Sequence, residues 1–149
     1  MDKGVYCLRF SCSGTRIRPG ALGEIVVKPG WLVYTGSAQG PGGLSRVRRH
    51  IAFAEKQDRI PRWHVDYLLG SPEVCLRSAV CAITAKNLEC TLASALPGNR
   101  IPGFGSSDCR CGSHLAISGS DPAEAITGAF TRIGLVPIIT TIKREQHEE

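Results

Sequence analysis

The sequence predicts an α+β fold, a small α/β sandwich whose central sheet is mainly antiparallel and is flanked by helices. Residues 4–10 and 74–83 alternate in polarity and are rich in β-forming side chains, which is typical of strands. Residues 44–56 carry apolar side chains at helical spacing. Because no linker interrupts this chain of 149 residues, we expect a single domain over residues 1–142 and a charged, frayed tail over 143–149.

The first half of the chain is expected to supply two further strands. Residues 11–20 are polar and contain glycine and proline, so they are predicted to be a loop. Residues 22–27 are predicted to form one strand and residues 31–36 the other. The turn signal at residues 28–30 lies between them, so we expect them to pair across it as antiparallel neighbours. The glycine-rich residues that follow, up to residue 43, are expected to be a loop.

The second half of the chain is expected to add shorter elements. Residues 121–124 resemble a capping box with proline at the first helical position, and they predict a helix that ends near residue 132. The strand over residues 74–83 is expected to be central, with four apolar side chains on one face, namely Val74, Leu76, Val80 and Ala82. The other predicted elements are a turn of helix at 63–69, a helix capped by Asn87 that ends before Pro97, a loop at 101–112, and strands at 114–117 and 136–142.

The helix over residues 44–56 is predicted to have two distinct faces. Its apolar stripe consists of Leu44, Val47, Ile51 and Ala54. A second face consists of Arg46, Arg49, His50 and Phe53. We therefore expect Arg46 and His50 to be neighbours one turn apart, on a surface that points away from the core.

The distribution of charge indicates a polyanionic partner. The net charge is +5, and Lys and Arg outnumber Asp and Glu in residues 1–62, whereas acidic residues are in excess in 63–149. A basic first half is typical of a protein that binds nucleic acid, although a generic basic surface would give the same pattern. The sequence contains no long apolar run and no secretory signal. We therefore expect a cytoplasmic protein with no membrane association.

The cysteines and several aromatic residues are expected to be structural. Seven cysteines at irregular spacing argue against a disulfide framework, and most of them are expected to be small buried apolar residues. Trp31 and Trp63 are predicted to be core residues rather than platforms for nucleobases. His64 is predicted to be a structural histidine with its polar atoms satisfied.

Several motifs, taken in order, resemble those of the GIY-YIG nuclease superfamily. Gly4-Val-Tyr6 and Tyr34-Thr-Gly36 resemble the two halves of the signature, and Arg46-Val-Arg-Arg-His50 resembles the Arg-x-x-x-His pattern that follows it in homing endonucleases. Glu89 lies early in a later predicted helix, where the family places its metal-binding glutamate. Longer motifs resemble an uncharacterised branch of this superfamily that occurs in archaea and bacteria, alone or fused to the repair enzyme endonuclease III. These motifs include Trp63-His-Val-Asp-Tyr-Leu-Leu69 and Phe104-Gly-Ser-Ser-Asp-Cys-Arg-Cys-Gly-Ser-His-Leu115.

The resemblance implies a metal-dependent endonuclease that hydrolyses phosphodiester bonds. It implies Tyr6 as the general base and Tyr34 as the residue that positions water or phosphate. Arg46 offers a planar, permanently charged group suited to phosphate, and His50 could carry a proton. The Glu89 carboxylate could hold Mg²⁺ or Mn²⁺. The structural alternatives are sheet aromatics for the tyrosines, a solvated arginine, and a first-turn helix charge for Glu89.

The expected partner is nucleic acid, with DNA favoured, and a repair protein is considered as a second partner. The residues expected to contact nucleic acid are Gly36, Ser37, Gly42, Gly43, Arg48 and Arg49. The family's downstream asparagine has no clear match, since Asn99 is too close and Ser106, Ser107 or Asp108 could replace it. The alternative function is therefore a nucleic-acid-binding module of the same fold without catalysis.

A zinc site is a second alternative at the end of the last motif. Cys109, Cys111 and His114 supply three zinc-binding side chains close together in the sequence. No second pair of cysteines at the usual spacing exists, so one distant cysteine would have to be the fourth ligand. The preferred interpretation is a tight turn that leads into a strand, with the thiols packed inside.

Overall fold

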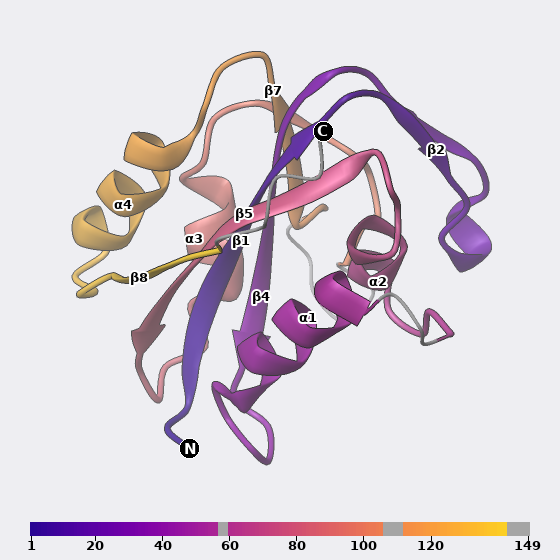
Figure 1. The fold of residues 1–149 in the computed structure, drawn as a ribbon. Helices are drawn as coiled ribbons and strands as arrows, with labels where there is room; N and C mark the ends of the chain where they lie inside the picture. Colours follow the sequence, from indigo (N-terminus) through magenta and orange to yellow (C-terminus); the bar gives the residue numbers. More distant parts are fainter. Residues whose placement is uncertain (57–59, 106–111, 143–149) are drawn as a thin grey trace.

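The computed structural model describes residues 1–56, 60–105 and 112–142, and it confirms the predicted α+β class (Figure 1). The strands are β1 (Gly4–Cys12), β2 (Thr15–Ile17), β3 (Ile25–Val27), β4 (Gly30–Ala38), β5 (Val74–Ile83), β6 (Asn99–Arg100), β7 (Leu115–Ser118) and β8 (Ile138–Thr141). The helices are α1 (Ser45–Lys56), α2 (His64–Leu69), α3 (Glu89–Ser94) and α4 (Ala123–Arg132), with a 3₁₀ turn at Gly20–Leu22. Six strands form an antiparallel sheet in the order β6-β7-β4-β1-β5-β8, and β2 and β3 form a separate pair.

Helices cover both faces of the sheet, which makes a three-layer sandwich (Figure 1). Side chains alternate between the two faces of a strand, so β1 contributes to two cores. Tyr6, Leu8 and Phe10 belong to the core beneath α1 and α2. Val5 and Cys7 belong to the second core, which also contains apolar side chains of α3 and α4. The central strand β1 is therefore buried on both faces. Its pairing with β4 and β5 determines where the residues of those two strands lie.

The predicted pairing of residues 22–27 with residues 31–36 is wrong. β4 instead pairs with β1 along its whole length and with β7 on its other side, from Trp31 to Tyr34. β3 pairs with β2, which occupies part of the segment predicted to be a loop. The apolar side chains of β4 face both cores, so this strand belongs in the sheet interior beside β1.

The prediction that β5 presents four apolar residues on one face is also wrong. The register between β1 and β5 shifts after Arg9, which pairs with Ser78, whereas Phe10 pairs with Leu76. Arg77 is the extra residue, and a bulge of this kind inverts the alternation beyond it. Leu76 consequently belongs to the α1–α2 core and Val80 to the α3–α4 core.

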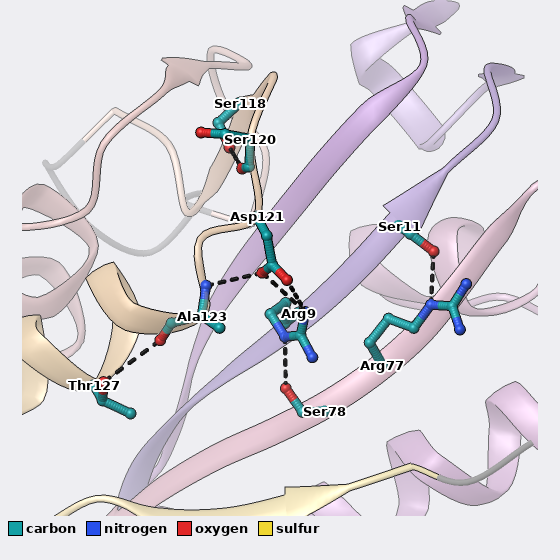
Figure 2. Close-up of polar contacts among 9 residues, drawn as sticks. All are labelled: Arg9, Ser11, Arg77, Ser78, Ser118, Ser120, Asp121, Ala123 and Thr127. Carbon is teal, nitrogen blue, oxygen red and sulfur yellow. Dashed lines mark hydrogen bonds and ion pairs between the residues drawn. The ribbon is translucent and has the colours of Figure 1, made fainter.

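The start of α4 is tied to the sheet by one arginine of β1. Both oxygens of the Asp121 carboxylate accept hydrogen bonds from Nη1 of Arg9, at 2.9 and 3.0 Å, and Oδ1 also accepts one from the amide of Ala123 (Figure 2). Nε of Arg9 donates to Oγ of Ser78 on β5 at 2.9 Å. The predicted helix is thus confirmed, but Pro122 is its N-cap residue rather than its first helical residue, and the predicted capping box is absent because the N-cap makes no side-chain capping hydrogen bond. The Asp121 carboxylate bonds the sheet through Arg9 and the first turn of α4 through the amide of Ala123.

The helix that carries Glu89 begins later than the predicted cap. Its N-cap residue is Leu88, which makes no side-chain capping hydrogen bond, and Asn87 is exposed. Its position follows from the burial of Leu92 and Ala93 in the core rather than from a polar cap. Among the helices in the described residues, none is long and apolar enough to cross a membrane.

Candidate functional site

Two tyrosines from neighbouring strands lie side by side in the core beneath α1 and α2. The ring centroids of Tyr6 on β1 and Tyr34 on β4 are 6.5 Å apart, and the exposed fractions of these residues are 1% and 6%. Gly36 pairs with Tyr6 across the two strands. A Cβ atom at Gly36 would lie 2.3 Å from Cζ of the Tyr6 ring. The glycine of the second predicted motif therefore leaves the space that the tyrosine of the first motif fills.

His50 contacts the hydroxyl group of Tyr6, so the prediction that His50 points away from the core is wrong. Tyr6 Oη lies 2.8 Å from His50 Nε2, and only 7% of His50 is exposed. The buried residues of α1 are Val47, His50 and Phe53. Residues three apart share a helix face, so the buried stripe runs through the histidine.

Burial lowers the pKa of His50 to about 4, and the guanidinium groups of Arg46 and Arg49 lower it as well. The carboxylate of Asp66 opposes them, but it does not overcome the effect of burial. The imidazole is therefore neutral at pH 7, and Nε2 is able to accept a proton from the phenol of Tyr6.

The two phenols share an electrostatic environment with one arginine and one glutamate. Burial raises the pKa of Tyr6 well above its usual value, and the neighbouring Tyr34 and the charge of Glu89 raise it further. Arg46 lowers the pKa of Tyr6 through its charge and a hydrogen bond. Burial also raises the pKa of Tyr34, with Glu89 adding to the rise and Arg46 opposing it. The charges of Arg46 and Glu89 thus act on both phenols, and we call these four residues the tyrosine cluster.

Arg46 occupies a fixed position between β4 and the segment before α2. Its Nη1 donates a hydrogen bond to the carbonyl oxygen of Ser37 at 3.0 Å, and its Cζ lies 4.6 Å from the ring centroid of Trp63. Half of Trp63 is exposed, so the prediction that it is a core residue is wrong. Its ring packs on a guanidinium rather than on apolar side chains, which a cation–π contact favours. Trp31 is partly buried, and the Cζ atom of Arg9 lies 5.2 Å from its ring centroid.

A pocket of about 530 Å³ opens beside this cluster. The carboxylate of Asp66 is buried at its wall and accepts hydrogen bonds from the backbone amides of Arg62 and Trp63, at 2.9 and 3.0 Å. These bonds hold the segment before α2 against the pocket. The lining residues are Arg46, Arg49, His50, Phe53, Ile60, Arg62, Trp63 and Asp66. Three arginines around a cavity of this size make it a suitable place for phosphate.

The other residues predicted to contact nucleic acid have varied settings. Arg48 is exposed on α1, outside the lining of this pocket. Gly42 is exposed with φ of +87°. Gly43 is buried, its amide donates to the carbonyl oxygen of Gly40, and a Cβ atom there would lie 2.2 Å from the carbonyl oxygen of Asp2. The lack of a side chain at Gly43 thus lets the N-terminal segment of the chain pack closely against it.

Glu89 could hold a divalent ion next to the two phenols. Its side chain is 19% exposed. Among the described residues, no three His, Cys, Asp or Glu side chains are grouped to bind a metal. A hard ion such as Mg²⁺ can nevertheless be held by one carboxylate together with water and phosphate oxygens. The residues present therefore fit a Mg²⁺ or Mn²⁺ ion that binds together with its substrate.

His114 lies between Glu89 and a cysteine. Its Nδ1 is 3.3 Å from Oε2 of Glu89, and its Nε2 is 3.7 Å from Sγ of Cys90. The other two predicted zinc ligands, Cys109 and Cys111, lie outside the described residues.

Two further predictions concern residues near the site. His64 is confirmed as a structural histidine, because its Nδ1 accepts a hydrogen bond from the amide of Gly105 at 2.7 Å. Asn99 is exposed on β6, where it pairs with Ile117. The candidates to replace the family asparagine, residues 106–108, lie outside the described residues.

The sequence gave no role at the site to four residues that the structure places at or next to it, namely Arg62, Trp63, Asp66 and Cys90. Asp66 carries a recognisable signal, since it lies three residues after Trp63 at the start of a helix. Cys90 directly follows Glu89 in the sequence. Nothing in the sequence distinguished Arg62 from other surface arginines, and the exposure of Trp63 depends on a tertiary contact with Arg46.

The fold and the site define an α/β sandwich with a buried tyrosine pair, an arginine-lined pocket and a partly exposed glutamate at the start of α3. The chain belongs to the family described as a domain of unknown function, DUF123, whose model matches residues 5–135. No curated protein and no solved structure matches the chain. Its function therefore has to be argued from its own residues.

Proposed function

We propose that the protein is a GIY-YIG-type endonuclease that uses a divalent metal ion to hydrolyse phosphodiester bonds in DNA. The observation that carries the proposal is the buried phenol pair beside the arginine-lined pocket: the rings of Tyr6 and Tyr34 are 6.5 Å apart, Tyr6 contacts His50 at 2.8 Å, and Arg46 and His50 line the pocket. The charges of Arg46 and Glu89 act on the pKa values of both phenols. These residues and the two phenols come from four different elements, and the resemblance assigns a catalytic role to each of them. A nuclease of this kind would act in the cytoplasm, on damaged or branched DNA and beside a repair protein.

In this proposal, Tyr6 takes a proton from the attacking water and passes its own proton to His50. The hydroxyl group and Nε2 are 2.8 Å apart, and the imidazole is neutral before the reaction. Burial opposes formation of the phenolate, whereas the positive charge of Arg46 favours it. Tyr34 is close enough to hold the water or the phosphate in place.

The pocket beside the cluster is proposed to bind the phosphate and a neighbouring nucleotide. Arg46 offers its planar guanidinium to the phosphoryl oxygens, and Arg49 and Arg62 add positive charge. The exposed half of Trp63 offers a surface on which a nucleobase can stack. Mg²⁺ or Mn²⁺ at Glu89 would stabilise charge on the phosphoryl and leaving oxygens.

The test is cleavage by the full chain of supercoiled, branched and single-stranded DNA, with Mg²⁺ or Mn²⁺ and with EDTA. We expect metal-dependent cleavage that Glu89→Gln reduces by about 100-fold or more, as for loss of a stabiliser of transition-state charge. Glu124→Gln is the matched control, because Glu124 is an exposed first-turn glutamate of α4. Cleavage that is absent with every substrate, or that is equal in the two variants, would refute the proposal.

The second candidate function is a nucleic-acid-binding module without catalysis. It is favoured by the burial of both phenols, which raises their pKa values and holds them protonated. It predicts salt-dependent DNA binding that Arg46→Ala weakens, without turnover in any metal. DNA affinity that stays constant between low and moderate salt would exclude it.

A further inference from the structure

The arginine-lined pocket also contains a carboxylate, which the binding of phosphate does not require. Asp66 lines the pocket, and only 7% of this residue is exposed. Its Oδ2 atom accepts hydrogen bonds from the backbone amides of Arg62 and Trp63. Its Oδ1 atom has no hydrogen bond or ion pair with any of the described residues, and it is not fully enclosed. Oδ1 is therefore an acceptor that a molecule in the pocket can reach.

The charge of Asp66 favours a neutral group beside it. Asp66 raises the pKa of His50, which also lines the pocket, whereas Arg46 and Arg49 lower it. A phosphate is attracted by the two guanidinium groups and repelled by the carboxylate. The part of a ligand that meets Oδ1 is thus expected to be uncharged and to donate hydrogen bonds.

Three apolar side chains make the pocket suitable for a flat ring. Phe53, Ile60 and Trp63 contribute to its lining. Half of Trp63 is exposed, and aromatic side chains of this kind stack on nucleobases. The volume of about 530 Å³ lies within the range of about 300–1,000 Å³ that is typical of pockets for small organic molecules. A nucleobase is flat and uncharged, and adenine, cytosine and guanine each carry an amino group that donates hydrogen bonds.

We propose that the pocket receives an unpaired nucleobase, whose amino group donates a hydrogen bond to Oδ1 of Asp66. The phosphate of the same nucleotide then lies against the arginines. In duplex DNA the base is paired and stacked, so it enters the pocket only where it is single-stranded or turned out of the duplex. Thymine has no amino group, and its carbonyl oxygens would face the carboxylate. This binding mode rests on the proposed function and defines its substrate as DNA with an unpaired nucleotide that carries an amino group.

Asp66→Asn is the informative substitution, because it replaces one carboxylate oxygen by an NH₂ group. The oxygen that remains can still accept from the backbone amides of Arg62 and Trp63, whereas the NH₂ group presents a donor to the base in place of an acceptor. Asp121→Asn is the matched control, because the Asp121 carboxylate also accepts a hydrogen bond from an amide at the start of a helix. That helix, α4, packs on the face of the sheet opposite to α1 and the pocket.

The experiment measures binding of the full chain to labelled duplex DNA by fluorescence anisotropy in EDTA, where metal-dependent cleavage does not occur. Each duplex carries one unpaired nucleotide, which is adenine, purine (adenine without its amino group) or an abasic site. We expect the wild type and Asp121→Asn to bind unpaired adenine about 10-fold more tightly than unpaired purine, as for one hydrogen bond to a charged group. The abasic duplex should bind about 10-fold more weakly again, because stacking is lost. Asp66→Asn should bind adenine and purine about equally.

Two outcomes would overturn this assignment. The first is equal affinity of the wild type for unpaired adenine and unpaired purine, a comparison that does not depend on how any variant folds. The second is an Asp66→Asn variant that keeps the preference for adenine. Equal affinities together with cleavage that depends on Glu89 would remove the base pocket and leave the nuclease standing. A preference for adenine without any cleavage would support the base pocket and refute only the nuclease.

Discussion

The contact between His50 and Tyr6 predicts a specific loss of stability in mild acid. Lowering the pH is the perturbation, and protonation of His50 is its target. In the unfolded chain His50 binds a proton below pH about 6.5. In the folded protein, where burial lowers its pKa, it does so only below pH about 4. Between these values the unfolded state holds more protons, so a fall in pH favours unfolding.

The magnitude follows from the two pKa values. A difference of about 2.5 between them corresponds to about 3 kcal/mol in the free energy of unfolding. About 2 kcal/mol of this is lost between pH 7 and pH 5, and most of the remainder is lost by pH 4. Above pH 7 the histidine is neutral in both states and contributes no further change.

Urea denaturation of the wild type and of His50→Gln, each at pH 7 and pH 5, measures this contribution. Glutamine is neutral at both values, and its amide oxygen can accept the hydrogen bond of Tyr6. His64 and His114, whose pKa values burial also lowers, are common to both proteins and cancel. We expect the wild type to lose about 2 kcal/mol more than the variant. Equal losses in the two proteins would refute the assignment of His50 as a buried neutral imidazole.

Three further predictions concern other parts of the structure. Gly36→Ala should destabilise the protein by about 1–3 kcal/mol, because the new methyl group meets a buried phenol ring, whereas Gly119→Ala, in open space, should change thermal stability little. Arg9→Ala and Asp121→Ala should show a coupling of up to about 1 kcal/mol in a double-mutant cycle, because half of the carboxylate is exposed. A coupling near zero would remove this bridge from the account of how α4 is held. Arg62→Ala should weaken DNA binding about equally for all sequences and reduce the salt slope by about one, as measured by fluorescence anisotropy over a salt series. An unchanged salt slope would mean that Arg62 contacts no phosphate, which would place the phosphate outside the pocket.

Local sequence patterns predicted most elements of the fold. Strand β1 and helices α1 and α4 are each favoured by residues close together in the chain, and each of these elements is present. The partner of β4 was missed because pairing depends on which strand can bury both of its faces. The bulge at Arg77 was missed because nothing in the local pattern marks an extra residue.

The composition of the site was easier to predict from the sequence than its geometry. The resemblance indicated Tyr6, Tyr34, Arg46 and Glu89, and in the structure the charges of Arg46 and Glu89 act on the pKa values of the two phenols. The inward orientation of His50 could not be foreseen, because two competing helical stripes differ by a rotation of about one residue. The contact between Cys90 and His114 joins residues from α3 and the start of β7, so no spacing rule predicts it.

Arg46 lies beside the part of β4 beyond its pairing with β7, and its charge has a second effect there. Within the described residues, β7 pairs with β4 as far as Tyr34, and the amide of Thr35 still donates to the carbonyl oxygen of His114. Beyond it, the carbonyl oxygen of Ser37 accepts a hydrogen bond from Arg46. An unpaired strand edge is a template on which another chain can add a strand, and a charge fixed there discourages such aggregation. A neutral substitution at Arg46 would expose this edge to other molecules. The guanidinium that is proposed to meet the phosphate is thus also expected to disfavour the addition of another strand at this edge.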